Sequence, residues 1–144
     1  MLKIRKVSFD EHEKIKTFYS NNNYRQQISR KDLFIIAEDT KEIGRYLGIV
    51  RLVKEHNILV LRGMRVEPFF QRKGIGSKIL NFAESQINNR ECYCISYRYL
   101  KGFYEKNGFR EIMTQEIPGF LKERYEKYTK EYNLDVIVMK RPVS

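Results

Sequence analysis

Two glycines, Gly74 and Gly76, stand at the start of a predicted helix, within the basic segment Gln71–Lys78. A glycine inside a helix costs about 1 kcal/mol relative to alanine, so two of them there need a reason. Glycine lets a bulky anion approach the backbone, where the free N–H groups of the first turn and the positive end of the helix dipole can hold it. Arg72 and Lys73 add positive charge beside the same turn. The segment therefore predicts a site for a phosphate or pyrophosphate.

Two common phosphate-binding patterns do not fit this segment. The P-loop pattern G-x-x-x-x-G-K-[ST] fails because no glycine lies five residues before Gly76, and Ser77 precedes Lys78. The dinucleotide pattern G-x-G-x-x-G fails because Ile79 occupies the place of its third glycine. The alternative that remains is a helix start that is softened by glycine and binds nothing.

A second motif lies further along the chain, where Phe103–Phe109 reads Phe-Tyr-Glu-Lys-Asn-Gly-Phe. It resembles the F-Y-x-x-x-G-F signature of the GNAT N-acetyltransferase superfamily, and Val66–Gly76 resembles the acyl-CoA signature Q/R-x-x-G-x-G/A of the same family. One glycine motif would carry little weight, but two in this order, separated by a helix and a strand, indicate the family. The order of elements resembles the family from Leu2 to Met139. It implies a single domain, residues 1–144, in which helices flank a mixed, mostly antiparallel α/β sheet.

The resemblance also implies how acetyl-CoA, the expected co-substrate, would bind. In this family the strand before the glycine loop splays away from the next strand, and acetyl-CoA lies between the two. Met64 and Val66 would offer backbone hydrogen bonds to the pantetheine, and Gly63 would fit the bulge that drives the splay. Backbone N–H groups of the glycine loop would hold the pyrophosphate. The loop residues concerned are Gln71, Arg72, Lys73, Gly74, Ile75, Gly76 and Ser77. No metal is expected.

The implied reaction moves an acetyl group to a primary amine of a small molecule or protein, by direct attack in a ternary complex. An amine with a pKa near 10.4 is only about one part in a thousand neutral at pH 7.4, so a base is expected. Glu67, which follows the CoA-binding strand, is a candidate, and the alternative is a solvated turn residue. By resemblance, Tyr104 would protonate the leaving thiolate, and the alternative is a core tyrosine. Glu116 is a weaker candidate for the base.

Hydrophobic periodicity predicts the elements that position these residues. Strands are predicted over Leu2–Phe9, Leu33–Glu38, Tyr46–Val53, Ile58–Val66, Cys92–Tyr97, Phe109–Met113 and Leu134–Met139. Helices are predicted over Glu11–Tyr19 with Asp10 as N-cap, Tyr24–Ile28, Arg72–Ile87, Tyr99–Lys106 and Phe120–Tyr132. The second, third and fourth strands are joined by short turns, so they must pair antiparallel.

The late helix Phe120–Tyr132 is the feature most particular to this chain. Pro118-Gly119 breaks the chain before it, and its apolar stripe needs a surface to cover. The stripe consists of Leu121, Tyr125, Tyr128 and Tyr132. We expect the helix to pack beside the acceptor site, with Phe120 or Tyr125 lining it. The alternative is a helix that caps the edge of the sheet.

The chain carries a formal net charge of +10 and has a sequence pI near 9.6, which suggests an anionic partner. The phosphates of CoA explain part of this charge. Two other functions stay open: a nucleic-acid-binding module, for which Tyr97, Arg98 and Tyr99 interleave aromatic and basic residues, and an acyl-CoA-binding protein without catalysis. Nucleic acid is not expected as the main ligand. The basic surface argues against a polycationic acceptor.

Membrane association is not expected, because no apolar run approaches the ~20 residues of a membrane span. The N-terminal segment lacks the features of a signal peptide. Cys92 and Cys94 are the only cysteines, and their spacing favours two structural thiols in a reducing compartment. We therefore expect a cytoplasmic protein, as a monomer or a homodimer.

Overall fold

The protein is described here by a computed structural model, which covers residues 1–7 and 9–143. Its strands form one seven-stranded sheet in the order β1-β2-β3-β4-β5-β7-β6. The strands are β1 (Leu2–Lys6), β2 (Leu33–Asp39), β3 (Tyr46–Glu55), β4 (Ile58–Val66), β5 (Cys92–Tyr97), β6 (Arg110–Glu111) and β7 (Val136–Arg141). Only β4 and β5 pair parallel, and every other pair is antiparallel. The predicted mixed, mostly antiparallel sheet is confirmed.

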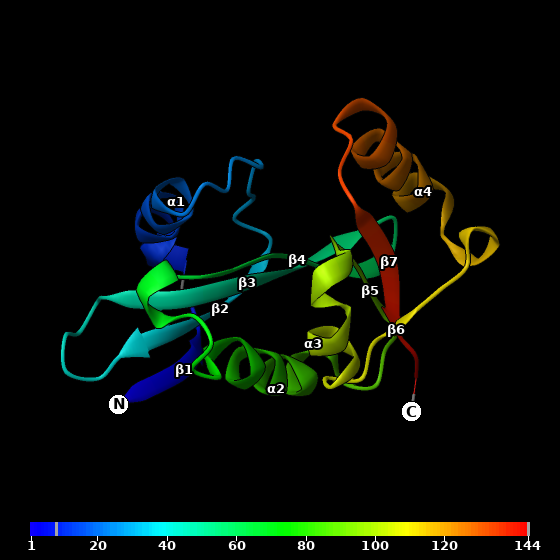
Figure 1. Ribbon diagram of the computed structural model, residues 1–144. Helices are drawn as coiled ribbons and strands as arrows, with labels where there is room; N and C mark the ends of the chain where they lie inside the picture. Colours follow the sequence, from blue (N-terminus) through cyan, green and yellow to red (C-terminus); the bar gives the residue numbers. More distant parts are fainter. Residues whose placement is uncertain (8, 144) are drawn as a thin grey trace.

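Helices cover both faces of the sheet (Figure 1). The α-helices are α1 (His12–Asn21), α2 (Ile75–Ile87), α3 (Lys101–Glu105) and α4 (Gly119–Glu126). The short 3-10 helices are η1 (Phe9–Glu11), η2 (Pro68–Phe70), η3 (Arg98–Leu100) and η4 (Thr114–Glu116), and η5 (Lys127–Glu131) is a π-helix. α1 and α4 lie on one face, whereas α2 and α3 lie on the other. We call these the α1/α4 face and the α2/α3 face.

The core has a layer on each face of the sheet. Neighbouring residues of β2, Ile35 and Ile36, point to opposite faces and are both 0% exposed, which explains the continuous apolar run in that strand. On the α2/α3 face, Ile79 of α2 joins the cluster of Ile35. On the opposite face, Ile15 of α1 joins the cluster of Ile36, and Leu121 of α4 belongs to a separate cluster over β4, β5 and β7.

The N-terminal boundaries differ from the prediction. β1 ends at Lys6, and the predicted continuation of the strand passes through Ser8, which lies outside the described residues. Asp10 lies within η1, and α1 starts at His12, one residue later than predicted, with Glu11 as its N-cap. The predicted helix Tyr24–Ile28 is wrong. Asn23 adopts a left-handed φ of 60° after α1, and the chain then runs in irregular backbone, in which Tyr24 is buried against β3.

The C-terminal elements are present with shifted boundaries. The predicted strand Phe109–Met113 is reduced to β6, and the last strand, β7, starts and ends two residues later than predicted. The predicted helix Phe120–Tyr132 is found as α4 followed by η5. The predicted apolar stripe is buried at its start, where Leu121 is 0% exposed, but it is exposed at its end, where Tyr132 is 56% exposed.

The two cysteines are buried on β5 and form no disulfide, as expected from their spacing. Both side chains point to the α2/α3 face. Burial raises the pKa of the Cys92 thiol to about 12 and raises the pKa of Cys94 as well. Within the described part of the chain, no helix has the length and apolar character to cross a bilayer.

Candidate active site

The centre of the sheet opens between β4 and β5. These strands pair only at Leu59 with Cys92 and at Val60 with Tyr93, although β4 runs on to Val66. On their other edges both strands stay paired, β4 with β3 and β5 with β7. The second half of β4 therefore has no strand partner on its β5 side, which is the splay that the resemblance implied.

Backbone groups of β4 point into this opening. The Glu67 N–H donates a hydrogen bond to the carbonyl of Leu47 in β3, at 2.9 Å. Because alternate residues of an antiparallel strand direct their backbone groups to opposite edges, the groups of Val66 face the open edge. The Val66 carbonyl accepts a hydrogen bond from Gln71 Nε2 at 3.0 Å, and the Met64 carbonyl accepts one from Arg65 Nη1 at 2.8 Å.

A β-bulge at Gly63 bends β4 at the opening. Arg62 pairs with Arg51 and Arg65 pairs with Ile49, so two residues of β4 oppose one of β3. Gly63 has a φ of 64°, and its carbonyl accepts a hydrogen bond from Tyr19 Oη at 2.9 Å. A Cβ at Gly63 would lie 2.7 Å from the hydroxyl oxygen of Tyr19, so the position requires glycine. The predicted bulge is confirmed.

The glycine loop leads into α2 with two left-handed residues. Gly74, the N-cap, has a φ of 82°, and Arg72 has a φ of 63°. α2 therefore starts at Ile75 and not at Arg72 as predicted. Lys78 N–H makes the first helical bond, to the Gly74 carbonyl, which leaves the N–H groups of the preceding first turn without intrahelical partners. A Cβ at Gly74 would meet nothing within 4 Å, so the loop is open to a ligand.

Two exposed side chains of the loop, Gln71 and Lys73, contact neighbouring residues. Gln71 is tied to Val66, as described above. Lys73 Nζ lies 5.3 Å from the centre of the Phe69 ring and 5.4 Å from that of Phe70. Ile75 is 4% exposed in the core, so only its backbone N–H is available to a ligand. An arginine at positive φ, as at Arg72, is uncommon, and such residues cluster at functional sites.

The second motif packs directly against the first. A Cβ at Gly76 would lie 3.1 Å from Phe103 Cζ, so glycine lets the Phe103 ring approach the first turn of α2. Gly108, with a φ of 91°, turns the chain so that Phe109 N–H donates to the Tyr104 carbonyl at 3.1 Å. The rings of Tyr104 and Phe109 meet edge to face, with centres 5.8 Å apart.

Tyr104 lies on the α2/α3 face and is 6% exposed. Burial raises the pKa of Tyr104 well above its usual value; Cys94 adds to this effect, and the positive charge of Arg65 acts against it. The hydroxyl therefore keeps its proton at physiological pH.

The two candidate bases each have a partner within the fold. Glu67 Oε1 lies 3.2 Å from Arg45 Nη2, in an ion pair at the end of β4. Glu116 Oε1 accepts a hydrogen bond from Met113 N–H at 3.0 Å in the turn formed by η4.

α4 places Phe120 and Tyr125 in different surroundings. The Phe120 ring lies 4.5 Å from the ring of His56 at the β3–β4 turn, with the Arg124 guanidinium 5.8 Å from its centre. Tyr125 instead lines an open pocket of about 520 Å³ at the β6 side, together with Lys101 and Glu111. α4 thus covers the sheet over β4, β5 and β7, and only its Phe120 side faces the β3–β4 hairpin.

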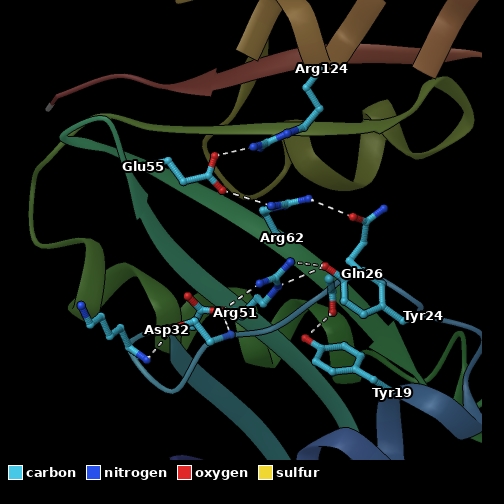
Figure 2. Close-up of polar contacts among 11 residues, drawn as sticks. Tyr19, Tyr24, Gln26, Asp32, Arg51, Glu55, Arg62 and Arg124 are labelled. Atoms are coloured by element: carbon cyan, nitrogen blue, oxygen red, sulfur yellow. Dashed lines mark hydrogen bonds and ion pairs between the residues drawn. The ribbon is translucent and has the colours of Figure 1, made fainter. Parts of the chain in front are cut away.

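Two groups of polar side chains also lie on the α1/α4 face (Figure 2). Arg51, 2% exposed, bonds Asp32 at 2.8 Å and the Tyr24 hydroxyl at 2.7 and 3.0 Å. Sequence analysis missed this cluster, although an arginine in the apolar run of β3 was a signal of a buried ion pair.

Further along the same face, Glu55 joins two arginines (Figure 2). Glu55 Oε1 lies 3.1 Å from Arg62 Nη1, and its Oε2 lies 2.6 Å from Arg124 Nη2. Arg62 Nη2 also reaches Gln26 Oε1 at 3.5 Å. This network connects α4 to β4 and to the loop after α1.

Basic residues of the segment considered for nucleic acid are partly neutralised. Tyr97 and Tyr99 stack with ring centres 5.6 Å apart, but Arg98 between them lies 3.0 Å from Asp135. Lys101 Nζ lies 3.1 Å from Glu111. For metals, the described residues contain no group of three or more His, Cys, Asp or Glu that could hold an ion.

Comparison with known proteins agrees with this geometry. A family model for the acetyltransferase (GNAT) domain matches residues 4–119. The chain therefore belongs to the GNAT acetyltransferase family and is an acyltransferase that uses acetyl-CoA. No curated protein sequence matches the chain.

Several solved structures share the fold. Rv2747 from Mycobacterium tuberculosis, in complex with CoA, has a TM-score of 0.72 and 17% identity, covering 99% of each chain. A GNAT acetyltransferase from Staphylococcus aureus MU50 has a TM-score of 0.67 and 18% identity over 100% of both chains. N-acetylglutamate synthase from Neisseria gonorrhoeae, complexed with coenzyme A and N-acetyl-glutamate, has a TM-score of 0.69 and 16% identity; the similarity covers 100% of this chain but only 35% of the synthase.

The surroundings of Phe120 and Tyr125 lead to a differential prediction. If Phe120 lines the acceptor site, Phe120→Ala should raise the KM for the acceptor ~3- to 10-fold and leave the KM for acetyl-CoA unchanged. Tyr125→Ala, the matched control on the other side of α4, should leave both KM values within ~2-fold. Steady-state kinetics with each substrate varied in turn measures this. A lower melting temperature with intact KM values for Phe120→Ala would make the helix purely structural.

Proposed function

We propose that this protein is an N-acetyltransferase that moves the acetyl group of acetyl-CoA to a primary amine by direct attack in a ternary complex. The observation that carries the proposal is the opening between β4 and β5, which the glycine loop borders at one end and which has Tyr104 on one face. These three features come from separate parts of the chain and converge on one place.

The chain's own residues suit acetyl-CoA as the substrate. The first-turn N–H groups of Ile75, Gly76 and Ser77 would hold the pyrophosphate, with Arg72 and Lys73 adding positive charge. Val66 and Met64 border the opening in which the pantetheine would lie, and the unpaired edge of β4 offers it backbone groups. CoA bound to structural neighbours is consistent with this assignment.

Tyr104 would supply a proton to the thiolate that leaves acetyl-CoA. Its raised pKa keeps the hydroxyl protonated, and its burial among Phe103 and Phe109 keeps it oriented. Because Tyr104 stands on the α2/α3 face, the amine would reach the thioester from the opposite, α1/α4 face. The two substrates would thus meet within the opening from opposite sides of the sheet.

Glu67 is proposed as the general base, and its ion pair with Arg45 offers a competing structural role. If Glu67 accepts the proton of the amine, Glu67→Gln should lower kcat ~10²-fold at pH 7. The reduction in kcat should be smaller at high pH, where more of the amine is already neutral. Arg45→Gln, which removes the same ion pair, is the matched control. Equal, small effects of the two variants would assign Glu67 to the structure and leave proton removal to water.

The proposed function is tested by CoA release from acetyl-CoA in the presence of a panel of small primary amines and peptides. We expect acetyl-CoA-dependent modification of at least one amine, confirmed by mass spectrometry. Thermal-shift titration with CoA, ATP and single-stranded RNA runs in parallel. Stabilisation by CoA without turnover of any amine would favour a silent acyl-CoA-binding protein. Stabilisation by RNA alone would favour the nucleic-acid-binding alternative.

A further inference from the structure

The bulge at Gly63 brings two arginines of β4 to the same face of the sheet. In a regular strand, residues three apart point to opposite faces. The extra residue of the bulge changes this: Arg62 opposes Arg51, and Arg65 opposes Ile49. Ile49 belongs to the α1-side cluster, and directly opposed residues point to the same face. Both arginines therefore lie on the α1/α4 face, from which the acceptor approaches under the proposed function.

Four arginines on this face outnumber the two carboxylates that pair with them. The arginines concerned are Arg51, Arg62, Arg65 and Arg124. Asp32 pairs with Arg51, and Glu55 is shared between Arg62 and Arg124. Arg65 has no carboxylate partner among the residues that the structure describes. Within residues 1–7 and 9–143, its guanidinium donates a hydrogen bond only to the Met64 carbonyl, and it lies 5.0 Å from the centre of the Tyr24 ring.

One donor on the same face lacks an acceptor. Arg124 Nη1 is buried and has no hydrogen-bond partner in the described chain. A buried donor left without an acceptor is unfavourable, so the guanidinium of Arg124 is only partly satisfied by Glu55. The planar guanidinium group suits carboxylate and phosphate oxygens, which it can bind through two parallel N–H bonds.

We propose that the acceptor amine carries an anionic group, a carboxylate or a phosphate, which Arg65 binds beside the Gly63 bulge while Arg62 and Arg124 favour its approach. This inference rests on the proposed function and specifies its acceptor. The Arg65 guanidinium touches the carbonyl of Met64, at the opening itself. The anionic group therefore lies close to the reacting amine, as in a small amino acid or an amino-alkyl phosphate.

Matched amine pairs test the inference. β-Alanine is compared with β-alaninamide, and phosphoethanolamine with ethanolamine, with kcat/KM corrected for the fraction of neutral amine. In the wild type, the anionic member of at least one pair should react ~10-fold or more faster. Arg65→Gln should lower kcat/KM of that member ~10- to 100-fold and that of its neutral partner less than ~3-fold. The pair that responds identifies carboxylate or phosphate.

Two controls make the result specific to this site. Arg110→Gln removes the same charge from an exposed residue of β6 and should leave kcat/KM unchanged for both amines of each pair. Arg65→Lys keeps the positive charge but lacks the planar guanidinium group that can bind two oxygens at once. It should therefore give an intermediate loss of kcat/KM for the anionic amine. Affinity for CoA by calorimetry should be unchanged in all three variants. Equal losses for charged and neutral amines in Arg65→Gln, or a wild type that prefers neutral amines, would overturn the inference.

Failure of the enzyme assay is separable from failure of this inference. If no amine is acetylated, the proposed function is rejected, and the same pairs are titrated against the CoA-loaded protein by NMR. Binding of an anionic probe that disappears in Arg65→Gln would support the anion site on its own. Absence of such binding would overturn it.

Discussion

Replacing Gly74 by aspartate is expected to weaken CoA binding about 100-fold. Two unit charges about 5 Å apart interact by roughly 3 kcal/mol at an effective dielectric constant of 20, which corresponds to a factor of about 100 in affinity. The new carboxylate would stand at the N-terminus of α2, where the pyrophosphate is proposed to bind. A Cβ at Gly74 meets nothing within 4 Å, so no neighbouring atom blocks the new side chain, although its positive φ of 82° strains the backbone of any residue other than glycine. Isothermal titration calorimetry with CoA measures the loss.

Gly74→Asn is the matched control for charge. Asparagine has nearly the same shape, and Asn and Asp are the side chains that most readily adopt the left-handed conformation of Gly74. We expect the affinity of Gly74→Asn for CoA to fall less than ~5-fold, and both variants to melt within a few degrees of each other. Gly76 is less suitable, because any side chain there would meet Phe103. Equal affinities of the Asp and Asn variants would show that the pyrophosphate does not bind at this loop.

Tyr104→Phe is expected to lower kcat about 100-fold or more, which is the usual scale of general acid catalysis. The change removes one hydroxyl and keeps the ring contacts with Phe103 and Phe109, so affinity for CoA should be nearly unchanged. Tyr93→Phe removes the hydroxyl of another buried tyrosine, on the opposite face, and should leave kcat within ~2-fold. Pre-steady-state measurements identify an amine for which chemistry limits the rate. An unchanged kcat with that amine would make Tyr104 a core residue.

The pH dependence gives an independent check on Tyr104. Its pKa is raised by burial, so the hydroxyl stays protonated through neutral and moderately alkaline pH. The wild-type rate should therefore rise with pH as the amine loses its proton, without a falling limb below about pH 10, the pKa of an unperturbed tyrosine. A falling limb near pH 8 that Tyr104→Phe abolishes would contradict the raised pKa.

The glycine loop and the second motif could be predicted because each depends on local backbone requirements. Gly74 and Gly108 adopt positive φ, and glycine is the residue that does so at least cost. The contact between Gly76 and Phe103 could not be predicted, since it joins α2 to α3 across an intervening strand. The left-handed backbone conformation of Arg72 could not be predicted either. The apolar periodicity begins at Ile75 and does not determine the backbone conformation of the residues before it.

The polar network on the α1/α4 face depended on contacts between distant residues. Tyr24 was assigned to a helix from local pattern, but its hydroxyl is held by Arg51 of β3, which fixes the chain in an irregular path. Arg65 is adjacent in sequence to residues assigned to CoA. Only the register of β3 and β4 shows that the bulge turns its side chain to the other face.

The weak pairing of β4 with β5 has a consequence for the lifetime of the enzyme. In the sheet itself, the strands β1 to β4 are paired with the strands β5, β7 and β6 through two residue pairs of β4 and β5. A ligand lying in the opening would supply contacts that the strands lack, and at 100 times its Kd it would add about 2.7 kcal/mol to the free energy of unfolding. Changes of about 1–2 kcal/mol can alter protein abundance several-fold through proteolysis. We therefore expect acetyl-CoA scarcity to shorten the half-life of this protein, so that metabolic supply would set how much enzyme persists as well as how fast it works.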